Sequence, residues 1–470
     1  MNLVLLSSFP RSAVRRPLPC ASPKRSFRQG FSIIELMISI LIGMIVVLII
    51  MQLFSQTEQW NRNATAGGDT QSTAQIAAYT LTHSLAEAGG SVLAARARTD
   101  ADSATIASSD RVEILSSAGA ATTPLFLPTL PVRISTNPNG SNLGDSIEVL
   151  TQSGVFGNGG QALWRAVDST NPSFLVRSFQ GIEPGPAAAA TTGSKSWLLV
   201  SRAGNTYTDG SNTYHGALVE MASGNNAINQ DSVTKLFNVQ YAATLPDNLI
   251  SGLGSDAVLS TTAPSPGATT PSDTPSAHWI LGMGILAYER IQVGQSNSNG
   301  DTGLTRERRE ISDAGYPTLA RKSFDTPYVV FLKAYYGFDN GDPAGSASAG
   351  RVTHWLGADA CTVPRAADPG WTCTGIDSTR LPAAQRLVAV RFGIVVRSPQ
   401  HDKTIKRDSA ETVTLWKWNC GANLNCPAAD PTYTVAAGDD YRYYTLQTTV
   451  PLRSAIWNIA ADASTPAPTP

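Results

Sequence analysis

The longest apolar run of the chain lies near its N-terminus, at residues 31–51 (FSIIELMISILIGMIVVLIIM), and its 21 residues contain one ionisable side chain, Glu35. A helix rises 1.5 Å per residue, so this run spans about 31 Å, close to the roughly 30 Å hydrocarbon core of a bilayer. The pattern therefore predicts one membrane-spanning helix over residues 31–53.

A helical pattern continues at residues 54–90. Apolar residues at steps of three or four fall on one helical face, which we expect to pack against a sheet: Ala74, Ala77, Leu81, Leu85 and Ala88. The poor helix formers Asn61, Asn63, Gly67 and Gly68 predict a kink or a melted turn between the two parts. Gly89-Gly90 predicts the end of the helix, and nothing marks His83 as a ligand.

Strand patterns dominate from residue 91 onward. The clearest is the alternation of Val388, Val390, Phe392, Ile394 and Val396, with Arg391 and Arg397 on the opposite face. Further strands are expected near Ile147 and Val149 and in the runs Trp197–Val200, Leu236–Tyr241, Trp279–Val293, Tyr328–Tyr336 and Leu446–Leu452. The low-complexity residues 261–277 predict a surface loop, and residues 459–470 predict a disordered tail.

The expected fold is α+β: a long N-terminal membrane-spanning α-helix packed on an antiparallel β-sheet globular domain, residues 91–458, with large loop insertions. The chain has 470 residues, of which 42% are hydrophobic and 15% charged. This length and composition exclude a disordered tail or a disulfide mini-protein. Charged residues are scarcer than the roughly 25% of an average soluble protein, which is consistent with an extracytoplasmic, loop-rich head.

Charge is distributed unevenly about the apolar run. Residues 1–30 contain six basic and no acidic side chains, whereas the remainder contains 29 basic and 36 acidic ones. The positive-inside rule therefore places residues 1–30 in the cytoplasm and the residues after Trp60 outside. Nothing in the acidic remainder predicts a nucleic-acid-binding surface.

Two ordinary explanations of the apolar run are a cleaved secretory signal and a generic signal anchor. The run is longer than the usual 7–15 residues of a secretory signal, and the first small-residue cleavage pattern, Ala64 to Ala66, comes well after it. A signal anchor explains the length and the charge bias. It does not explain a glycine at the basic-to-apolar junction or a carboxylate five residues later.

The string Arg28-Gln29-Gly30-Phe31-Ser32-Ile33-Ile34-Glu35 resembles the class III signal of type IV pilins and of type II secretion pseudopilins. The resemblance implies a leader at residues 1–30, which is long for this family. It implies that prepilin peptidase cuts after Gly30 on the cytoplasmic side. It also implies that Phe31 becomes an N-methylated first residue.

Glu35 has a physical role in this interpretation. A carboxylate in a membrane helix costs about 2.5–3.5 kcal/mol at the bilayer centre and less near the interface. Cleavage would create a positive α-amino group at Phe31, which can neutralise Glu35 of a neighbouring subunit and so set the register between subunits. The alternative is a Glu35 side chain that reaches into the lipid headgroups.

The C-terminal half carries a second resemblance. The strand exit Tyr335-Tyr336-Gly337-Phe338-Asp339-Asn340-Gly341-Asp342 and the terminal Tyr443–Arg453 segment, which contains Val450-Pro451-Leu452-Arg453, are similar to PilW-type minor pilins. Residues 91–320 match only in general character. The resemblance implies a minor pilin that primes or caps the type IV pilus within a minor-pilin tip complex.

The partners that the resemblance implies are prepilin peptidase, other minor pilins, the major pilin and the assembly platform in the bacterial inner membrane. Before assembly the head would lie in the periplasm, and afterwards at the pilus tip. Two alternatives remain. One is a type II secretion pseudopilin of the J-like class, and the other is an adhesin or ligand-binding head that the pilus delivers.

The cysteines predict two disulfides. Cys20 would leave with the leader, and the four that remain are Cys361, Cys373, Cys420 and Cys426. An even number in an oxidising compartment favours disulfides, and local pairing, Cys361 to Cys373 and Cys420 to Cys426, is the simplest of three connectivities. A zinc site is not favoured, because neither spacing is that of a zinc knuckle.

Other candidate sites are weak. Asp339, Asn340 and Asp342 could bind calcium, but the full calcium-binding loop is missing, and an Asn-Gly hairpin turn explains them better. The charged run Arg306–Glu310 predicts a solvated, salt-bridged surface. The five histidines are scattered and no catalytic motif is present, so we expect no enzyme activity, no cofactor and no metal.

Overall fold

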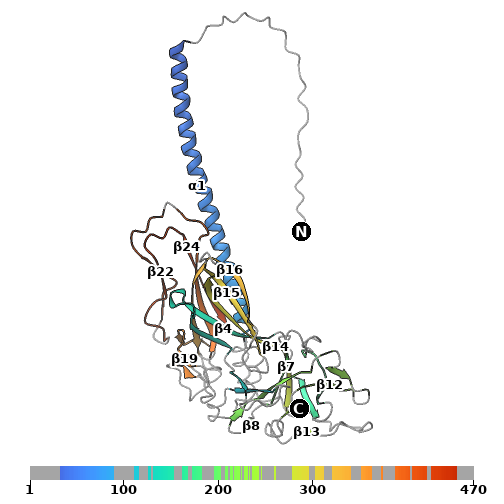
Figure 1. Ribbon diagram of the computed structural model, residues 1–470. Coiled ribbons are helices and arrows are strands. Elements are labelled where there is room, and N and C mark those ends of the chain that lie inside the picture. Colours follow the sequence, from blue (N-terminus) through green and yellow to red (C-terminus); the bar gives the residue numbers. More distant parts are fainter. Residues whose placement is uncertain are drawn as a thin grey trace, which may run out of the picture. The chain divides into compact units, whose positions relative to one another are not determined.

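The computed structural model describes residues 32–88, 111–115, 125–128, 131–152, 161–167, 172–182, 195–202, 207–209, 212–214, 216–222, 224, 227–230, 232, 235–242, 245, 259–260, 278–295, 302–311, 320–339, 351–362, 372–373, 387–402, 405–420 and 425–452. The chain forms two compact units, residues 1–62 and 63–470. Figure 1 shows the helix and the strands, coloured by their position along the chain. The expected loop at residues 261–277, the tail at 459–470 and Gly89-Gly90 lie outside the described ranges.

The N-terminal helix α1 extends from Ile33 to Ala86. It begins within the apolar run and continues through the amphipathic segment, so both predicted helical parts are confirmed. The predicted core-facing stripe is confirmed as well, because each of its members is 0–1% exposed: Ala74, Ala77, Leu81, Leu85 and Ala88. Small alanines on this stripe let the helix approach the sheet closely.

The predicted interruption of α1 is wrong. Residues 61–68 are helical, including Gly67 and Gly68. Glycine costs about 1 kcal/mol relative to alanine in a helix, but it keeps its N–H and so does not break the hydrogen-bond ladder as proline does. Local contacts also support this stretch: Arg62 pairs with Glu58 one turn earlier, and the buried Thr70 hydroxyl donates to the Ala66 carbonyl at 2.6 Å.

One sheet of the second unit packs against α1 through an antiparallel series of strands. The order is β3 (Val132–Thr136), β4 (Asp145–Gln152), β14 (His278–Gln295), β15 (Thr302–Glu310) and β16 (Ala320–Pro327). A short 3-10 helix, η3 (Ser141–Leu143), lies between β3 and β4. The strands expected near Ile147 and in Trp279–Val293 are therefore confirmed as β4 and β14.

A second antiparallel sheet has the order β18 (His354–Leu356), β17 (Val329–Phe338), β21 (Leu387–Arg397) and β24 (Tyr443–Pro451). The buried face predicted for β21 is confirmed, because Val388, Val390, Phe392, Ile394 and Val396 are buried. On the opposite face Arg391 and Arg397 are partly exposed, but Val395 is buried as well, in the cluster that contains Leu415 and Trp416. Gly144 bridges to Leu332 of β17 and so joins the two sheets. Its φ is +91°, and a Cβ there would collide with the Leu332 carbonyl oxygen, so this junction requires glycine.

The first half of β14 belongs to a further group of strands in the same 14-stranded sheet. Their order is β11 (Ile228–Gln230), β12 (Phe237–Gln240), β6 (Ser173–Val176), β5 (Gln161–Val167), β14, β7 (Ser196–Arg202), β10 (Gly216–Glu220), β1 (Arg111–Leu115) and β2 (Leu125–Pro128), with β13 (Leu259–Ser260) beside β5. Most pairs are antiparallel, and β1–β10 and β13–β5 are parallel.

Three small antiparallel pairs complete the described strands: β8 (Tyr207–Asp209) with β9 (Asn212–Tyr214), β19 (Cys361–Thr362) with β20 (Thr372–Cys373), and β22 (Glu411–Thr414) with β23 (Thr432–Val435). The β22–β23 pair belongs to a segment that we call the arm, residues 405–435. The arm buries Leu415 and Trp416 against Val330, Phe331 and Val395 of the second sheet.

Two separate hydrophobic cores divide the second unit into two lobes. The core that contains α1 also contains side chains of β3, β4, the second half of β14, β15, β17, β21 and β24. We call this part the helix lobe. A second core contains only side chains from residues 163–280. We call the part built by β1, β2 and residues 161–285 the insert lobe.

Of the two loop predictions, one needs correction. The predicted turn at Asn340-Gly341 lies outside the described residues, and Phe338 at the end of β17 pairs with His354 of β18. The charged run Arg306–Glu310 is salt-bridged as predicted, but it lies within β15 between two neighbouring strands and is partly buried rather than fully solvated. Strand pairing over β15 overrides the polarity of its sequence.

Candidate functional site

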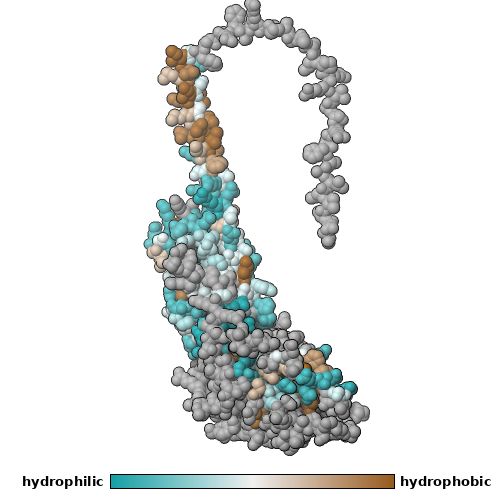
Figure 2. All heavy atoms as spheres, turned by 45° about the vertical axis from the view of Figure 1, so that its right-hand side comes forward, coloured by the Kyte–Doolittle hydropathy of each residue, from teal (hydrophilic) through white to brown (hydrophobic). Residues whose placement is uncertain are grey.

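The N-terminal part of α1 presents an apolar surface. From Ile33 to Phe54 its large apolar side chains are about half or more exposed, and Ile34 is 68% exposed. Figure 2 shows these apolar residues gathered around the N-terminal part of the helix. Within the described ranges, α1 is the one helix that is long and apolar enough to cross a membrane. An isolated soluble protein rarely leaves such a surface uncovered, so this surface requires lipid or other apolar helices.

Glu35 lies in the first turn of α1 and is exposed. The Ser39 hydroxyl donates to the backbone carbonyl of Glu35 at 2.8 Å. It therefore does not bind the side-chain carboxylate. Among residues 32–88, no basic side chain forms an ion pair with that carboxylate. The structure thus presents one anion on an apolar helix surface. Gly30 and Phe31 lie outside the described ranges.

The C-terminal part of α1 is held on the sheet by polar contacts as well as by its apolar stripe. The Ser84 hydroxyl donates to a Glu289 carboxylate oxygen at 2.9 Å. Glu289 on β14 is 6% exposed, and Arg306 on β15 pairs with it at 3.1 Å. A buried carboxylate with two partners fixes one position of the helix along the strands. No local sequence pattern predicts this contact, because Ser84 and Glu289 are 205 residues apart.

Two buried tyrosines stiffen the second sheet. The Tyr336 hydroxyl accepts a hydrogen bond from the Ile134 amide, and it lies 3.3 Å from the Ile134 carbonyl. Burial raises the pKa of Tyr336 well above its usual range. The neighbouring Tyr335 packs against Trp416 and Trp418 of the arm. Burial, and then the negative charge of Asp145, raise the pKa of Tyr335 to about 12.

An aromatic and cationic cluster holds the arm on the outer face of the second sheet. The Arg391 guanidinium lies 4.7 Å from the Trp416 ring and 5.1 Å from the Trp418 ring. Cation–π contacts of this kind stabilise by about 0.5–2 kcal/mol. Burial lowers the pKa of Arg391. Gly393 allows this packing, since a Cβ there would lie 2.5 Å from a Trp416 ring carbon.

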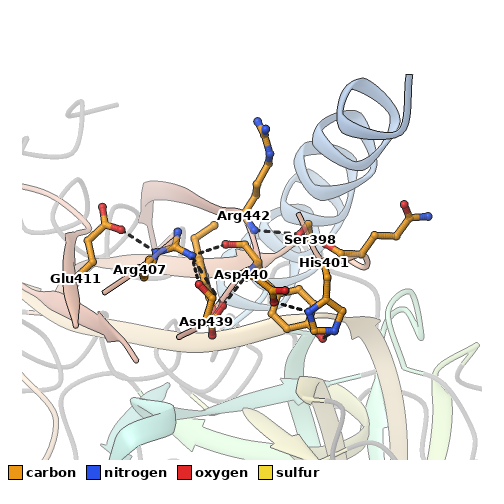
Figure 3. A network of polar contacts seen from close by, with 10 residues as sticks. Ser398, His401, Arg407, Glu411, Asp439, Asp440 and Arg442 are labelled. Carbon is orange, nitrogen blue, oxygen red and sulfur yellow. Dashed lines mark hydrogen bonds and ion pairs between the residues drawn. The ribbon is translucent and has the colours of Figure 1, made fainter. Parts of the chain in front are cut away.

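The start of the arm is tied to the segment before β24 by the polar network in Figure 3. Arg407 donates to the carbonyls of Asp439 and Tyr441 at 2.8 Å each, and to Glu411 at 2.9 Å. The Tyr443 hydroxyl donates to Asp439 at 2.7 Å, and burial, followed by this hydrogen bond, raises the pKa of Tyr443. The network closes the base of the arm with charge-assisted hydrogen bonds.

The same network contains a serine, a histidine and an aspartate, but they do not form a nucleophilic triad. His401 contacts Asp440 through one ring nitrogen and the Tyr441 hydroxyl, at 2.7 Å, through the other. Ser398 is 1% exposed, and its hydroxyl donates to the Gln400 carbonyl at 2.7 Å. The serine hydroxyl therefore does not donate to the histidine, as a nucleophile activated by that histidine would.

The four cysteines of the head are joined locally: Cys361 to Cys373 and Cys420 to Cys426. The first pair links β19 to β20 and is buried in the core that contains α1. The second pair closes a loop within the arm. Each disulfide therefore ties down a short stretch outside the main sheets.

The calcium candidate is only partly described. Asp339 is 4% exposed, and Asn340 and Asp342 lie outside the described ranges. Over the part of the chain that the structure describes, no group of three or more histidine, cysteine, aspartate or glutamate side chains is arranged to hold a metal ion.

Comparison with known proteins identifies the N-terminal segment. Residues 25–51 match the family model described as the prokaryotic N-terminal methylation motif. Neither the curated proteins nor the solved structures gave a match. The matched segment contains Gly30, Phe31 and Glu35 together with the start of α1. The chain therefore carries a class III prepilin signal, the N-terminal signal of type IV pilin-like proteins.

Proposed function

We propose that the protein is a minor pilin of the type IV pilus that primes or caps pilus assembly within a minor-pilin tip complex. The observation that carries this proposal is the carboxylate of Glu35 on an exposed apolar helix within the methylation motif. The role is structural, and the protein is the substrate of prepilin peptidase rather than an enzyme.

The assembly mechanism follows from charge and burial. Cleavage after Gly30 leaves the α-amino group of Phe31 at the start of the apolar helix. In a bundle of such helices, the amine of one subunit pairs with Glu35 of its neighbour, and the apolar side chains from Ile33 to Phe54 pack together. Removing one partner of a desolvated ion pair is costlier than removing both. Any shift of one helix along its neighbour would leave both charges unpaired, so the pair selects one register between the subunits.

The size of the head favours a tip position over a repeating shaft position. Residues 63–470 form one unit that contains both lobes, and such bulk would crowd a closely packed shaft. The similarity of Tyr335–Asp342 and Tyr443–Arg453 to PilW-type minor pilins supports the same assignment. The partners would be other minor pilins, the major pilin and the inner-membrane assembly platform, with the head in the periplasm before assembly.

The decisive experiment is a substitution series at Glu35 in the native host. Glu35→Ala and Glu35→Gln should be processed and inserted into the membrane like the wild type, but should lose incorporation into pili. Glu35→Asp should retain part of it. Glu58→Ala is the matched control, because Glu58 is a carboxylate on the same helix that already pairs with Arg62. Normal incorporation of Glu35→Ala would refute the pairing mechanism.

Mass spectrometry of the mature N-terminus tests the processing step. We expect a chain that begins at Phe31 with one added methyl group, and a chain that retains residues 1–30 would contradict the proposal. Immunogold labelling tests position: labels confined to pilus ends support the tip complex, and labels spread along the shaft contradict it. A type II secretion pseudopilin would instead be required for protein secretion, and neighbouring genes would encode that system.

A further inference from the structure

The insert lobe has a core of its own. Among the described residues, the core around α1 includes none between 150 and 290. The second core lies entirely within residues 163–280, and it includes Phe174, Leu198 and Tyr241. A lobe that has its own hydrophobic core buries its apolar side chains without help from α1.

The strand β14 changes its pairing partner from one lobe to the other between two consecutive residues. His278 to Ile285 pair with β7 of the insert lobe, with a bulge at Gly282/Gly284. Leu286 to Gln292 pair with β4 of the helix lobe. Leu286 is paired directly with Gln152, the last residue of β4. The chain thus leaves the helix lobe after Gln152 and returns to it at the adjacent position, as an insertion into a β-hairpin does.

The contact between the lobes is a small apolar cluster. It joins Leu150, Leu286 and Ile311 of the helix lobe to insert-lobe side chains that include Trp197, Leu199, Leu218 and Met283. No residue of α1 belongs to this cluster. The hairpin β1–β2 is a second connection, because β1 pairs with β10, and it belongs to the insert lobe.

We infer that the surface by which this protein contacts other pilins is confined to α1 and the helix lobe, and that the insert lobe is a carried module that stays solvent-exposed in the assembled pilus. This inference rests on the proposed function. The apolar residues that α1 buries in a core cluster lie in the helix-lobe core, and the apolar surface that assembles in the proposed function, Ile33 to Phe54, is on α1 itself. Neither of them depends on the insert lobe. The module is then free to contact a partner outside the cell.

The test removes the module from the full-length protein. Residues 153–285 are replaced by Asn-Gly, since a two-residue type I′ turn joins directly paired strand residues such as Gln152 and Leu286. Residues 111–128 are replaced by a Gly/Ser stretch of equal length. Leu150, Leu286 and Ile311, which lose their cover, are changed to threonine. We expect pilus number per cell within about twofold of the wild type.

The outcomes separate this inference from the proposed function. If the shortened protein is folded by circular dichroism and processed, yet pilus number falls about tenfold or more, the inference is overturned. Glu35→Ala introduced into the same shortened protein should abolish piliation. If Glu35→Ala assembles normally, the proposed function fails instead.

A second measurement keeps the inference testable if the shortened protein does not fold. Phe179 in the insert lobe is 45% exposed, and Tyr79 on α1 is 70% exposed. With the four cysteines of the head joined in disulfides, Phe179→Cys and Tyr79→Cys each add one free thiol. Maleimide should label the Phe179→Cys thiol equally before and after assembly, whereas labelling of Tyr79→Cys should fall about tenfold in filaments. Protection of the Phe179→Cys thiol in filaments would overturn the inference.

Discussion

Lys333 on β17 places its ammonium group 3.0 Å from the carboxylate of Asp145 on β4, so one ion pair links the two sheets of the helix lobe. The Ala334 amide also donates to this carboxylate at 2.9 Å. The Asp145 side chain is 3% exposed. Burial raises the pKa of Asp145 above its ordinary value of 3.8, and the nearby Lys333 opposes that rise.

Lys333→Met should therefore destabilise the head in a pH-dependent way. At pH 7 the variant buries a carboxylate without its cation, which costs about 2–3 kcal/mol, since Lys333 is itself partly solvated. A carboxyl whose folded pKa lies above its unfolded value holds more protons in the folded state. The contribution of Asp145 to the free energy of unfolding should therefore rise as the pH falls toward about 4, and the stability difference between the variant and the wild type should shrink.

Urea unfolding at pH 7 and near pH 4 measures this effect, with the double variant Asp145→Asn/Lys333→Met as the control. The double variant removes both charges and should lose less stability at pH 7 than Lys333→Met alone. An equal loss at both pH values would show that Lys333 acts through packing rather than through its charge.

The buried stripe of α1 should dominate the attachment of the helix to the sheet. Leu81→Ala should lower the free energy of unfolding by about 2–5 kcal/mol, because Leu81 is 0% exposed in the main core. Tyr79→Ala, on the exposed side of the same helix, should change it by less than about 0.5 kcal/mol. Thermal unfolding in detergent compares the two. Similar losses would mean that the stripe does not carry the packing.

Tyr335 should make the head sensitive to alkaline pH. Its folded pKa is about 12, against an ordinary value of 10, so its contribution to stability is complete below pH 10 and is lost as the pH rises toward 12. Tyr335→Phe should reduce the loss of stability over that interval. Phenolate absorbance should also appear at lower pH in the unfolded protein than in the folded one. Identical titration curves would contradict the assignment.

Removal of the two disulfides should destabilise different parts of the head. Replacing Cys361 and Cys373 by alanine should cost about 3 kcal/mol from loop entropy alone, with further loss from the core. Replacing Cys420 and Cys426 should cost about 2 kcal/mol and should loosen the arm. Limited proteolysis with thermal unfolding distinguishes these results. If removal of Cys420–Cys426 destabilised the whole head more, the arm would be part of the main cooperative unit.

Local sequence patterns predict those parts of the fold whose structure depends on residues close together in the sequence. The stripe of Leu81 and Leu85 and the alternation of Phe392 and Ile394 each record one buried face, so periodicity was sufficient. Propensity alone predicts an interruption near Gly67, but the helix continues there because glycine keeps its N–H and leaves the hydrogen-bond ladder intact. The candidate site was likewise visible at Glu35, where a charge interrupts an apolar run.

Long-range pairing was not predictable from the sequence. Nothing in the sequence near Gln152 indicates that its partner is Leu286, and nothing near Ser84 indicates Glu289. The arm cluster was missed for the same reason, because Arg391 and Trp416 lie on segments whose contact depends on the completed sheet. The division into two lobes therefore emerges only from contacts in the folded chain, namely the two separate cores and the register of β14.

The insertion of one lobe between Gln152 and Leu286 has a mechanical consequence. A pull on the insert-lobe strands between Gln152 and Leu286 enters the helix lobe through the ends of β4 and β14, which are paired with each other, and it acts along both strands. The bonds of β4 to β3 and of β14 to β15 are then loaded together in shear, instead of being opened one after another. A joint loaded in this way resists tearing when the insert lobe is pulled.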